Sequence, residues 1–409
     1  MKDQNYTVLN KYYFCNKSCY RRQVEIQQIA KFLVVNGYQR TLDLKKADLV
    51  VFFTCACNQS YVHEMISQLN EIKSSIKKNA ELIVGSCLPK TDKESLDRVF
   101  QGKVITPTDF SALNELRDIK TRFEEIQPGC YMEEQLMRRL ASYYKSEGFI
   151  STLKEASSRS HKVILDATFR KTKVIMISKG CLRKCSYCAI RFATGNLQSK
   201  PLDIVMNQIT EGLESGYKRF DLYADSIGDY GLDIGTNLGE LFDRLIAIDK
   251  KFSIGIYDLH PHEFLKYFDK VELLCQSGKI HLLYVPTQSG NQRILKLMHR
   301  GCDINDLKNK LLTIKKHKKV FLQTSIIVGF PTETDDEFQD TVDFIEAVAF
   351  DNVYIHYYSD MPNTESSQLD GKIDKKTMRN RLNRILATNI KHIKRETEKE
   401  YSHISDEKS

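Results

Sequence analysis

Three cysteines stand close together in the segment SKGCLRKCSYCAIRF at residues 178–192. Cys181, Cys185 and Cys188 have the spacing C-x3-C-x2-C and directly follow an apolar run of strand length. A structural zinc site needs four closed ligands, and His161 is too distant in the sequence to be an obvious fourth. A 4Fe–4S cluster held by only three thiolates keeps an open position on one iron. The spacing therefore favours a catalytic cluster whose open iron a small molecule can chelate, over a zinc knuckle or a set of free thiols.

Three further cysteines follow strand-like apolar runs nearer the amino terminus. Cys19 comes after the first run, Cys55 ends the second and Cys87 ends the third. Because the carboxyl ends of parallel strands lie at one edge of a sheet, these thiols would converge there. We expect a second cluster at this edge, with Cys15 and Cys57 close by as competing ligands. The alternative is a scattered set of buried core thiols.

The first hundred residues alternate between strand-like and helix-like patterns. The runs YTVLNKYYF, ADLVVFFTC and AELIVGSC have the length of buried strands, and RQVEIQQIAKFLVVNG has helical periodicity. Strands separated by helices form a parallel sheet that is covered on both faces. We therefore expect a parallel α/β domain over residues 1–107. A more polar connector with helices of its own is expected over residues 108–170.

The alternation of strands and helices resumes after the connector. We expect six strands, at residues 173–178, 219–225, 252–259, 279–286, 320–330 and 352–359. Helices are expected between them, at residues 201–216, 237–249, 263–276, 291–317 and 334–348. Six such repeats are too few for a closed eight-stranded barrel and predict an open partial (β/α)6 barrel over residues 171–370. The fold class is thus α/β, with a basic amphipathic helix and a charged tail over residues 371–409.

The composition is that of a globular protein that stays in the cytosol. Apolar residues make up 41% of the 409 residues and charged residues 28%. There is no run of eighteen apolar residues, and the amino terminus lacks the apolar core of a signal peptide. We therefore expect no membrane association and a cytoplasmic location. Eleven cysteines in a cytosolic chain indicate metal-binding or catalytic thiols in place of disulfides.

The net charge of +8 is concentrated in residues 371–395. This segment has nine Lys and Arg and one Asp, a surplus of eight, so the rest of the chain sums to about zero. Its apolar residues recur at helical spacing, which predicts the amphipathic helix. The basic face of that helix is either solvated or a docking surface for a polyanion such as RNA.

The cysteine loop resembles the signature of the radical S-adenosylmethionine (SAM) superfamily, in which an aromatic residue, here Tyr187, commonly precedes the third cysteine. The resemblance implies that the three thiolates hold a 4Fe–4S cluster whose open iron binds the amino and carboxylate groups of SAM. Reductive cleavage of SAM then gives a 5′-deoxyadenosyl radical. That radical abstracts hydrogen from an unactivated C–H bond.

Polar residues at the strand ends of the second domain are expected to contact SAM. These positions are Asp225, Ser226, Gln288, Ser289, Gly290 and Arg293, with Gly329, Pro331 and Glu333 shaping the adenine side. The carboxylate and hydroxyl that end the second strand would hold the ribose or amino group. The glycine would let the backbone approach the ligand, and Arg293 would bind the SAM carboxylate as a fork donor. His260 and His262 look like metal ligands but flank a proline, which is more typical of a turn.

Longer segments resemble the methylthiotransferases within this superfamily. SCYRRQVEIQQIAKFLVVNGYQ, ADLVVFFTCAC and ELIVGSCLPK resemble the cysteine-bearing segments of that family's amino-terminal domain. The family spacing selects Cys19 over Cys15 and Cys55 over Cys57. The stretches YVPTQSGNQRILKLMHRG, IIVGFPTETDDEF and HYYSDMPNTESS match three later family motifs. The resemblance covers residues 10–394, with an interruption in the connector.

The family resemblance implies a transferase with two 4Fe–4S clusters. Cys19, Cys55 and Cys87 would hold an auxiliary cluster, on which one SAM methylates a sulfur. A second SAM, cleaved at the first cluster, would generate a substrate radical that takes up the methylthio group. An electron donor such as flavodoxin or ferredoxin is also implied.

The sequence departs from the family pattern at several positions. The family's asparagine after the first cysteine is Arg22, the asparagine of its N-T-C motif is Phe53, and its late R-x-G-T is MPNT. About fifty residues follow HYYSDMP without a strand-rich stretch, so we expect the family's RNA-binding β-barrel module (TRAM) to be absent.

The family resemblance and the charge of the basic helix predict the class of substrate. Most members methylthiolate a modified adenosine next to the tRNA anticodon, and the basic helix agrees with tRNA. One branch modifies an aspartate of a ribosomal protein, and DSIGDYGLD resembles that branch's Q-D-x-x-x-Y-G-x-D. We expect tRNA, with a protein or peptide as the second possibility. A non-catalytic iron–sulfur or zinc protein that binds RNA, and an enzyme whose second cluster only transfers electrons, are two further hypotheses.

Overall fold

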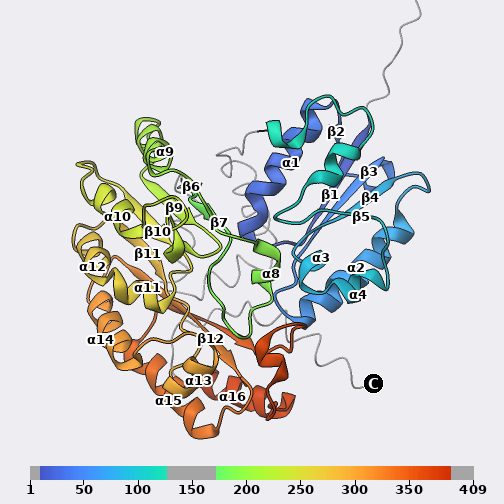
Figure 1. Ribbon diagram of the computed structural model, residues 1–409. Helices are drawn as coiled ribbons and strands as arrows, with labels where there is room; N and C mark the ends of the chain where they lie inside the picture. Colours follow the sequence, from blue (N-terminus) through green and yellow to red (C-terminus); the bar gives the residue numbers. More distant parts are fainter. Residues whose placement is uncertain (1–9, 127–171, 388–409) are drawn as a thin grey trace, which may run out of the picture. The chain divides into compact units, whose positions relative to one another are not determined.

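The computed structural model describes residues 10–126 and 172–387. These residues form two compact units, whose elements are labelled in Figure 1. The first unit contains the described residues up to 126 together with the short segments 188–195 and 360–363, and the second contains the rest. No helix in the described ranges is long and apolar enough to cross a membrane.

A five-stranded parallel sheet forms the centre of the first unit. In spatial order its strands are β2 (Gln39–Arg40), β1 (Lys11–Asn16), β3 (Leu49–Thr54), β4 (Glu81–Ser86) and β5 (Lys103–Val104). The apolar runs predict β1, β3 and β4, whereas β2 and β5 have two residues each and leave no periodic pattern in the sequence. The predicted parallel α/β domain is therefore confirmed.

Both faces of this sheet are covered because successive residues of β3 point to opposite sides. One side packs against α1 (Gln23–Val35), and the other packs against α2 (Gln59–Ser75), α3 (Leu88–Thr91) and α4 (Lys93–Asp97). The α1 side contains Leu49, Val51 and Phe53, and the α2 side contains Val50 and Phe52. This double coverage explains why β3 is apolar along its whole length.

The amino-terminal unit extends further than the predicted boundary at residue 107. Residues 108–126, which the polar sequence assigns to the connector, include the 3-10 turns η3 (Ser111–Glu115) and η4 (Phe123–Glu125). Apolar side chains of both turns pack into the α1 side of the sheet. Asn36 Oδ1 also accepts a hydrogen bond from the backbone N–H of Thr121 at 2.9 Å. These contacts correct the boundary to residue 126 at least, and the remainder of the connector lies outside the described residues.

The second unit contains the six predicted parallel strands. In spatial order they are β13 (Asn352–Tyr357), β12 (Phe321–Val328), β11 (Ile280–Tyr284), β10 (Ser253–Ile256), β9 (Arg219–Tyr223) and β6 (Thr172–Met176). Their spatial order follows their order in the chain, as in an open (β/α) barrel. The expected partial (β/α)6 barrel is therefore confirmed.

Helices cover the outer side of this sheet (Figure 1). They are α9 (Leu202–Glu214), α10 (Leu238–Ile246), α11 (Pro261–Lys266), α12 (Phe268–Gln276), α13 (Gln292–Leu297), α14 (Ile304–Lys315) and α15 (Asp335–Val348). The continuous helix expected at residues 291–317 is wrong. The chain leaves α13, passes through His299 with a φ of +55°, and restarts where Asp303 caps α14 by accepting the N–H groups of Asn305 and Asp306.

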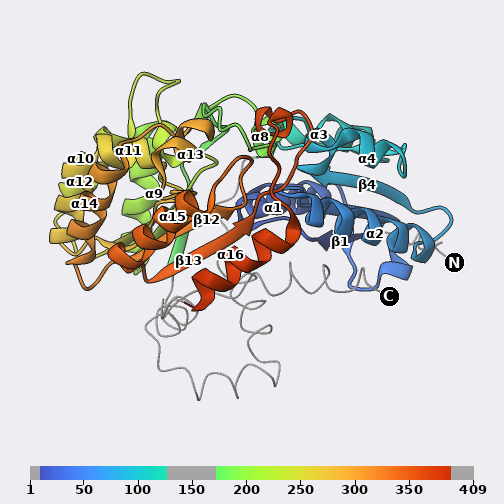
Figure 2. The same ribbon diagram turned by 90° about the horizontal axis from the view of Figure 1, so that it is seen from below.

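Two smaller elements complete the second unit. The antiparallel pair β7 (Ser178–Lys179) and β8 (Gln198–Ser199) brackets the cysteine loop. The part of this loop at residues 188–195, which includes α8 (Ile190–Thr194), belongs to the first unit. The predicted basic helix is α16 (Lys375–Ala387), which runs beside the β12–β13 edge of the sheet (Figure 2). Its Leu382 and Ile385 are buried in the same hydrophobic cluster as the sheet and its helices. The described part of this helix therefore belongs to the barrel unit.

Candidate active site

The cysteine loop begins at a glycine that the backbone requires. Gly180 has a φ of +80°, and a Cβ at this position would lie 2.0 Å from the carbonyl oxygen of Asn196. The N–H of Gly180 donates a hydrogen bond to Asp225 Oδ2 at 2.9 Å. Asp225, expected as a SAM contact, therefore holds the first turn of the loop from the end of β9.

Asp229 is a second anchor of the loop, and the sequence patterns do not single it out. Its buried carboxylate accepts hydrogen bonds from the backbone N–H of Leu182 at 3.0 Å and from Arg183 Nε and Nη2 at 3.0 and 2.6 Å. Arg183 also pairs with the buried carboxylate of Glu263. Because Arg183 stands between the first two cysteines, this ion-pair network fixes the conformation of the loop.

The second half of the loop docks on the turn that follows α13. The backbone N–H of Ser186 donates to the carbonyl oxygen of Met298 at 3.2 Å, and its Oγ donates to that of Leu297 at 2.7 Å. His299 Nδ1 lies 3.1 Å from the carbonyl oxygen of Lys184. The break between α13 and α14 therefore provides the platform on which the loop rests.

Arg300 brings a buried cation to one of the cysteines. Its Nη1 donates to Cys185 Sγ at 3.5 Å and to the Tyr187 hydroxyl at 3.1 Å, and its Nη2 donates to the carbonyl oxygen of Pro286. Burial disfavours the charged form, but Tyr187 and Cys185 raise the pKa of Arg300 above its ordinary value. Arg300 is therefore a cation at neutral pH. No spacing rule in the sequence pairs it with a cysteine 115 residues earlier.

The predicted cluster ligands of the loop are divided between the two units. Cys181 and Cys185 lie in the second unit, where Cys181 Sγ accepts a hydrogen bond from the backbone N–H of Arg183 at 3.4 Å. Cys188 begins the segment 188–195, whose helix α8 packs against α3 of the first unit. Binding of one cluster by these three thiolates stays a prediction.

Gln288 is the predicted SAM contact with the clearest structural sign of a ligand. It has a φ of +75° in the segment that follows β11, and its backbone N–H donates to the carbonyl oxygen of Ser325 at 2.8 Å. Its Oε1 is buried and has no hydrogen-bond partner among the described residues. A strained backbone and an unmet buried acceptor are typical of functional sites. Ser226 and Ser289 are buried at strand ends of the same sheet.

Two predicted SAM contacts have other partners in the structure. A Cβ at Gly290 would lie 2.6 Å from Thr341 Cα, so the close approach that Gly290 permits is to helix α15. Arg293 pairs with Glu337, and its Nη2 donates to the carbonyl oxygen of Thr332 at 2.8 Å. The hydrogen bond from Arg293 lowers the pKa of Glu337 to about 2. Arg293 thus fastens the start of α15, and its contact with SAM stays a prediction.

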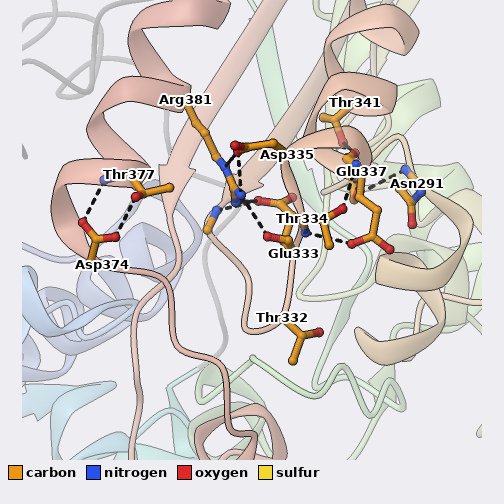
Figure 3. A network of polar contacts seen from close by, with 12 residues as sticks. Asn291, Thr332, Glu333, Thr334, Asp335, Glu337, Thr341, Asp374, Thr377 and Arg381 are labelled. Carbon is orange, nitrogen blue, oxygen red and sulfur yellow. Dashed lines mark hydrogen bonds and ion pairs between the residues drawn. The ribbon is translucent and has the colours of Figure 1, made fainter.

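The turn between β12 and α15, predicted to border adenine, is clamped by α16 (Figure 3). Arg381 Nη1 donates to Glu333 Oε2 at 2.8 Å, and its Nη2 donates to Asp335 Oδ1 at 3.0 Å. The N–H of Gly329 donates to the same Glu333 Oε2 at 3.0 Å. Burial raises the pKa of Glu333 to about 7, against the lowering effect of Gly329 and Arg381. Arg381 therefore serves the fold and is not part of an exposed basic face.

His260 and His262 form a turn, as the flanking proline indicates. His260 Nδ1 accepts a hydrogen bond from the backbone N–H of His262 at 3.2 Å and caps α11. Burial first, and then the charges of Arg300 and Arg183, lower the pKa of His260 to about 3, although Glu263 opposes this shift. His260 is therefore neutral at physiological pH.

We expect the folded chain to lose stability in mild acid through His260. An unfolded histidine protonates near pH 6.5 and the folded His260 near pH 3, so the unfolded state binds more protons between these values. The free energy of unfolding therefore falls as the pH decreases through this window. His260→Asn keeps a capping acceptor but does not titrate. Denaturant unfolding at pH 7 and pH 5 should show wild type losing about 2 kcal/mol more than this variant; equal losses contradict the expectation.

The three predicted auxiliary cysteines follow neighbouring strands of the first unit. Cys19 lies in the loop after β1, Cys55 directly follows β3, and Cys87 directly follows β4. Cys15 instead lies within β1 and packs against the α2 side of the sheet. Cys57 is exposed two residues beyond Cys55. The structure thus places the predicted three at one edge, where ligands of open α/β sheets bind.

The three thiols at this edge lie close enough to influence one another. Burial raises the pKa of Cys87, and Cys19 and Cys55 raise it further, whereas Arg22 lowers it. The pKa of Cys19 is raised by desolvation and by Cys55, although Cys19 also has a surface exposed to water. Arg22 is itself buried and paired with Glu25 at 2.8 Å. Arg22, at the position of the family's asparagine, therefore supplies a positive charge that lowers the pKa of Cys19 and of Cys87.

This arrangement fits a cluster that takes three cysteine ligands. Three thiols and a cation meet at the carboxyl end of a parallel sheet, and iron–sulfur clusters are held by thiolates. Within the described ranges, no three His, Cys, Asp or Glu side chains are arranged closely enough to hold a single metal ion. The three thiols and their placement therefore suit an iron–sulfur cluster and not a single metal ion.

The second unit has the fold and the cysteine loop of a radical SAM enzyme. Residues 175–345 match the family model of the radical SAM superfamily, and residues 11–106 match the model described as uncharacterized protein family UPF0004. Among solved structures, the radical SAM methyltransferase TsrM from Kitasatospora setae, with cobalamin and a 4Fe–4S cluster bound, has a TM-score of 0.57 at 14% identity. The match covers 88% of this chain and 76% of that chain and concerns the fold.

Curated relatives specify the family. The ribosomal protein uS12 methylthiotransferase RimO of Chlamydia felis is 30% identical over 382 residues, which cover 89% of this chain and 76% of the relative. The probable threonylcarbamoyladenosine tRNA methylthiotransferase of Pyrococcus abyssi is 28% identical over 379 residues, which cover 90% of this chain and 82% of the relative. The chain belongs to the radical SAM methylthiotransferase family. It is therefore a transferase whose cofactors are SAM and two 4Fe–4S clusters, which excludes the non-catalytic hypothesis.

Proposed function

We propose that this enzyme inserts a methylthio group at an unactivated C–H bond of a modified adenosine in tRNA, near the anticodon. The observation that carries the proposal is the presence of two cysteine sets, one on the loop after a single parallel strand and the other on the segments after three parallel strands. Cys181 and Cys185 follow the first strand of one sheet, and Cys19, Cys55 and Cys87 follow three strands of the other. One set serves SAM cleavage and the other serves sulfur delivery.

In this proposal Cys181, Cys185 and Cys188 hold the radical SAM cluster. When bound there, the cluster supplies the electron that cleaves SAM and thereby starts hydrogen abstraction from the substrate. Arg183 and Asp229 hold the loop in one conformation and so keep the thiolates positioned. The unmet Oε1 of Gln288 offers an acceptor to a polar hydrogen of SAM, such as its amino group or a ribose hydroxyl.

Cys19, Cys55 and Cys87 hold the auxiliary cluster, which supplies the sulfur that is methylated and transferred. Arg22 offsets the negative charge of these thiolates from a buried position beside them. A low-potential one-electron donor such as flavodoxin or ferredoxin completes the reaction. We place the enzyme in the cytoplasm, where tRNA is found.

Three observations support tRNA as the substrate. The relatives from Pyrococcus abyssi and Fusobacterium nucleatum are named for tRNA, and the latter is 26% identical over 383 residues. The net charge of the chain is +8. Lys375, Lys376 and Arg379 are exposed on α16, where phosphate groups could reach them. Because Arg381 is committed to the turn before α15, the basic surface is smaller than the sequence suggests.

A protein substrate is the second candidate, and the RimO relative at 30% identity favours it. The motif DSIGDYGLD, which resembles the protein-modifying branch, has an internal explanation. Asp225 holds Gly180, the Tyr230 hydroxyl donates to the carbonyl oxygen of Lys200, and Asp233 accepts the N–H of Ser199. The motif therefore holds the cysteine loop and the β7–β8 pair. Such a role is needed whatever the substrate, so the motif carries little information on it.

Mass spectrometry of cells with and without the gene tests the substrate. Digests of total tRNA and of ribosomal proteins are compared for a species that loses the mass of one methylthio group. The proposal expects the loss in a tRNA nucleoside, restored by the wild-type gene but not by Cys185→Ala. Loss in a ribosomal protein with unchanged tRNA supports the second candidate and contradicts tRNA.

A further inference from the structure

We propose that the guanidinium of Arg300 sets the reduction potential of the cluster that Cys185 binds, acting as a buried cation beside the cysteine sulfur. The proposal rests on the proposed function only in taking Cys185 as a ligand of the radical SAM cluster. It does not depend on the substrate. Arg300 acts through Cys185 and is therefore a positioning residue.

The contacts of Arg300 place its charge at the sulfur. Nη1 lies 3.5 Å from Cys185 Sγ, which is within hydrogen-bond range for sulfur, and 3.1 Å from the Tyr187 hydroxyl. Nη2 donates to the carbonyl oxygen of Pro286, which fixes the other side of the guanidinium. Only 4% of Arg300 is exposed, so water screens its charge weakly.

No carboxylate neutralises this charge among the residues that the structure describes. The hydrogen-bond partners of Arg300 there are a thiol, a phenol and a carbonyl oxygen. The other arginines near the site differ, because Arg183 pairs with two carboxylates and Arg381 pairs with Glu333 and Asp335. The positive charge of Arg300 therefore remains available to the cysteine.

The backbone around Arg300 keeps it in this position. His299 adopts a φ of +55°, which a non-glycine residue rarely adopts. The two hydrogen bonds of Ser186 and the contact of His299 with Lys184 join the turn to the cysteine loop on both sides of Cys185. A loop and a turn fastened at three further points hold the guanidinium and the sulfur at a constant distance.

A cation at this distance favours the reduced cluster. One-electron reduction adds one negative charge to the cluster and its thiolates, and a nearby cation in a poorly solvated site stabilises that charge. Hydrogen bonds to sulfur and local charge are the protein's main means of tuning such potentials. The electron comes from the external donor and passes to SAM on cleavage. Arg300 itself neither gains nor loses an electron or a proton.

Redox titration of the reconstituted full-length protein, followed by electron paramagnetic resonance, tests the proposal. The radical SAM cluster is identified as the one whose spectrum changes when SAM is added. Arg300→Met removes the charge at similar side-chain length and is expected to shift the potential of this cluster to more negative values. Arg300→Lys keeps a charge but cannot span all three partners, so a smaller shift in the same direction is expected.

Arg381→Met is the matched control, because Arg381 is also 4% exposed but contacts carboxylates and no thiol. The reduction potential of the radical SAM cluster in Arg381→Met is expected to equal that in the wild-type protein. Iron content and melting temperature are measured alongside, since a purely structural role would change these and leave the potential unaltered.

A potential in Arg300→Met equal to that of wild type overturns the proposal. If that variant does not retain the cluster, Arg300→Gln, which also removes the charge, decides, and an unshifted potential there overturns the proposal. A wild-type protein that cleaves SAM without forming a methylthio product contradicts the proposed function and leaves this test unaffected.

Discussion

Replacing Cys55 with alanine is expected to abolish methylthio transfer while leaving SAM cleavage within about twofold of wild type. Cys55 directly follows β3 in the first unit, whereas Cys181 and Cys185 belong to the second. Loss of one of three thiolates should remove the auxiliary cluster and about half of the bound iron. Product formation should fall by at least about 100-fold, since even outer-shell changes cost metal sites 10- to 100-fold.

The matched control for this variant is Cys57→Ala. Cys57 is exposed and lies two residues beyond Cys55. Cys57→Ala therefore makes the same chemical change as Cys55→Ala at a neighbouring position. It should retain full iron content and product formation. Iron analysis, 5′-deoxyadenosine release and product mass are measured for both variants. Product formation retained in Cys55→Ala, or lost in Cys57→Ala, contradicts the assignment of the auxiliary ligands.

Replacing Asp229 with alanine is expected to release the cysteine loop and to stop SAM cleavage. Asp229 is fully buried and holds both the backbone of Leu182 and the guanidinium of Arg183. Its removal leaves Arg183 with Glu263 alone and should lower the free energy of unfolding by about 3 kcal/mol. The radical SAM cluster should be lost with the loop conformation, so iron falls by about half.

A control at Asp351 separates this effect from general destabilisation. Asp351 is 3% exposed, accepts the backbone N–H of Leu322 at 2.9 Å and pairs with Lys315 at 2.9 Å, near the start of β12. Asp351→Ala should destabilise the chain by a similar amount while iron and SAM cleavage per folded molecule stay unchanged. Full iron content in Asp229→Ala contradicts the anchoring role.

The fold could be predicted from the sequence because its signals are local. Apolar runs in the sequence mark the longer strands, and Cys55 and Cys87 directly follow two of them. The edge at which Cys19, Cys55 and Cys87 gather then follows from parallel topology. The missed strands β2 and β5 are two residues long, which is too short to show a period.

The environment of the site could not be predicted, because it depends on contacts between distant residues. Arg300 and Cys185 are 115 positions apart, and Arg183 and Asp229 are 46 apart. Strand-end position assigns Arg293 and Gly290 to SAM, but it could not predict the contacts that both residues make within the protein. For both residues these contacts are with helix α15 or with the turn before it. The sequence pattern likewise places Arg381 on an exposed basic face, whereas the structure pairs it with Glu333.

We infer that this one chain uses SAM in two ways. The most direct test incubates the reconstituted wild-type protein with SAM, a low-potential reductant and unmodified substrate tRNA, and quantifies the products by mass spectrometry. We expect 5′-deoxyadenosine and S-adenosylhomocysteine in about equal amounts, together with methylthiolated nucleoside. Release of 5′-deoxyadenosine without S-adenosylhomocysteine would contradict it, because the second cluster would then only transfer electrons.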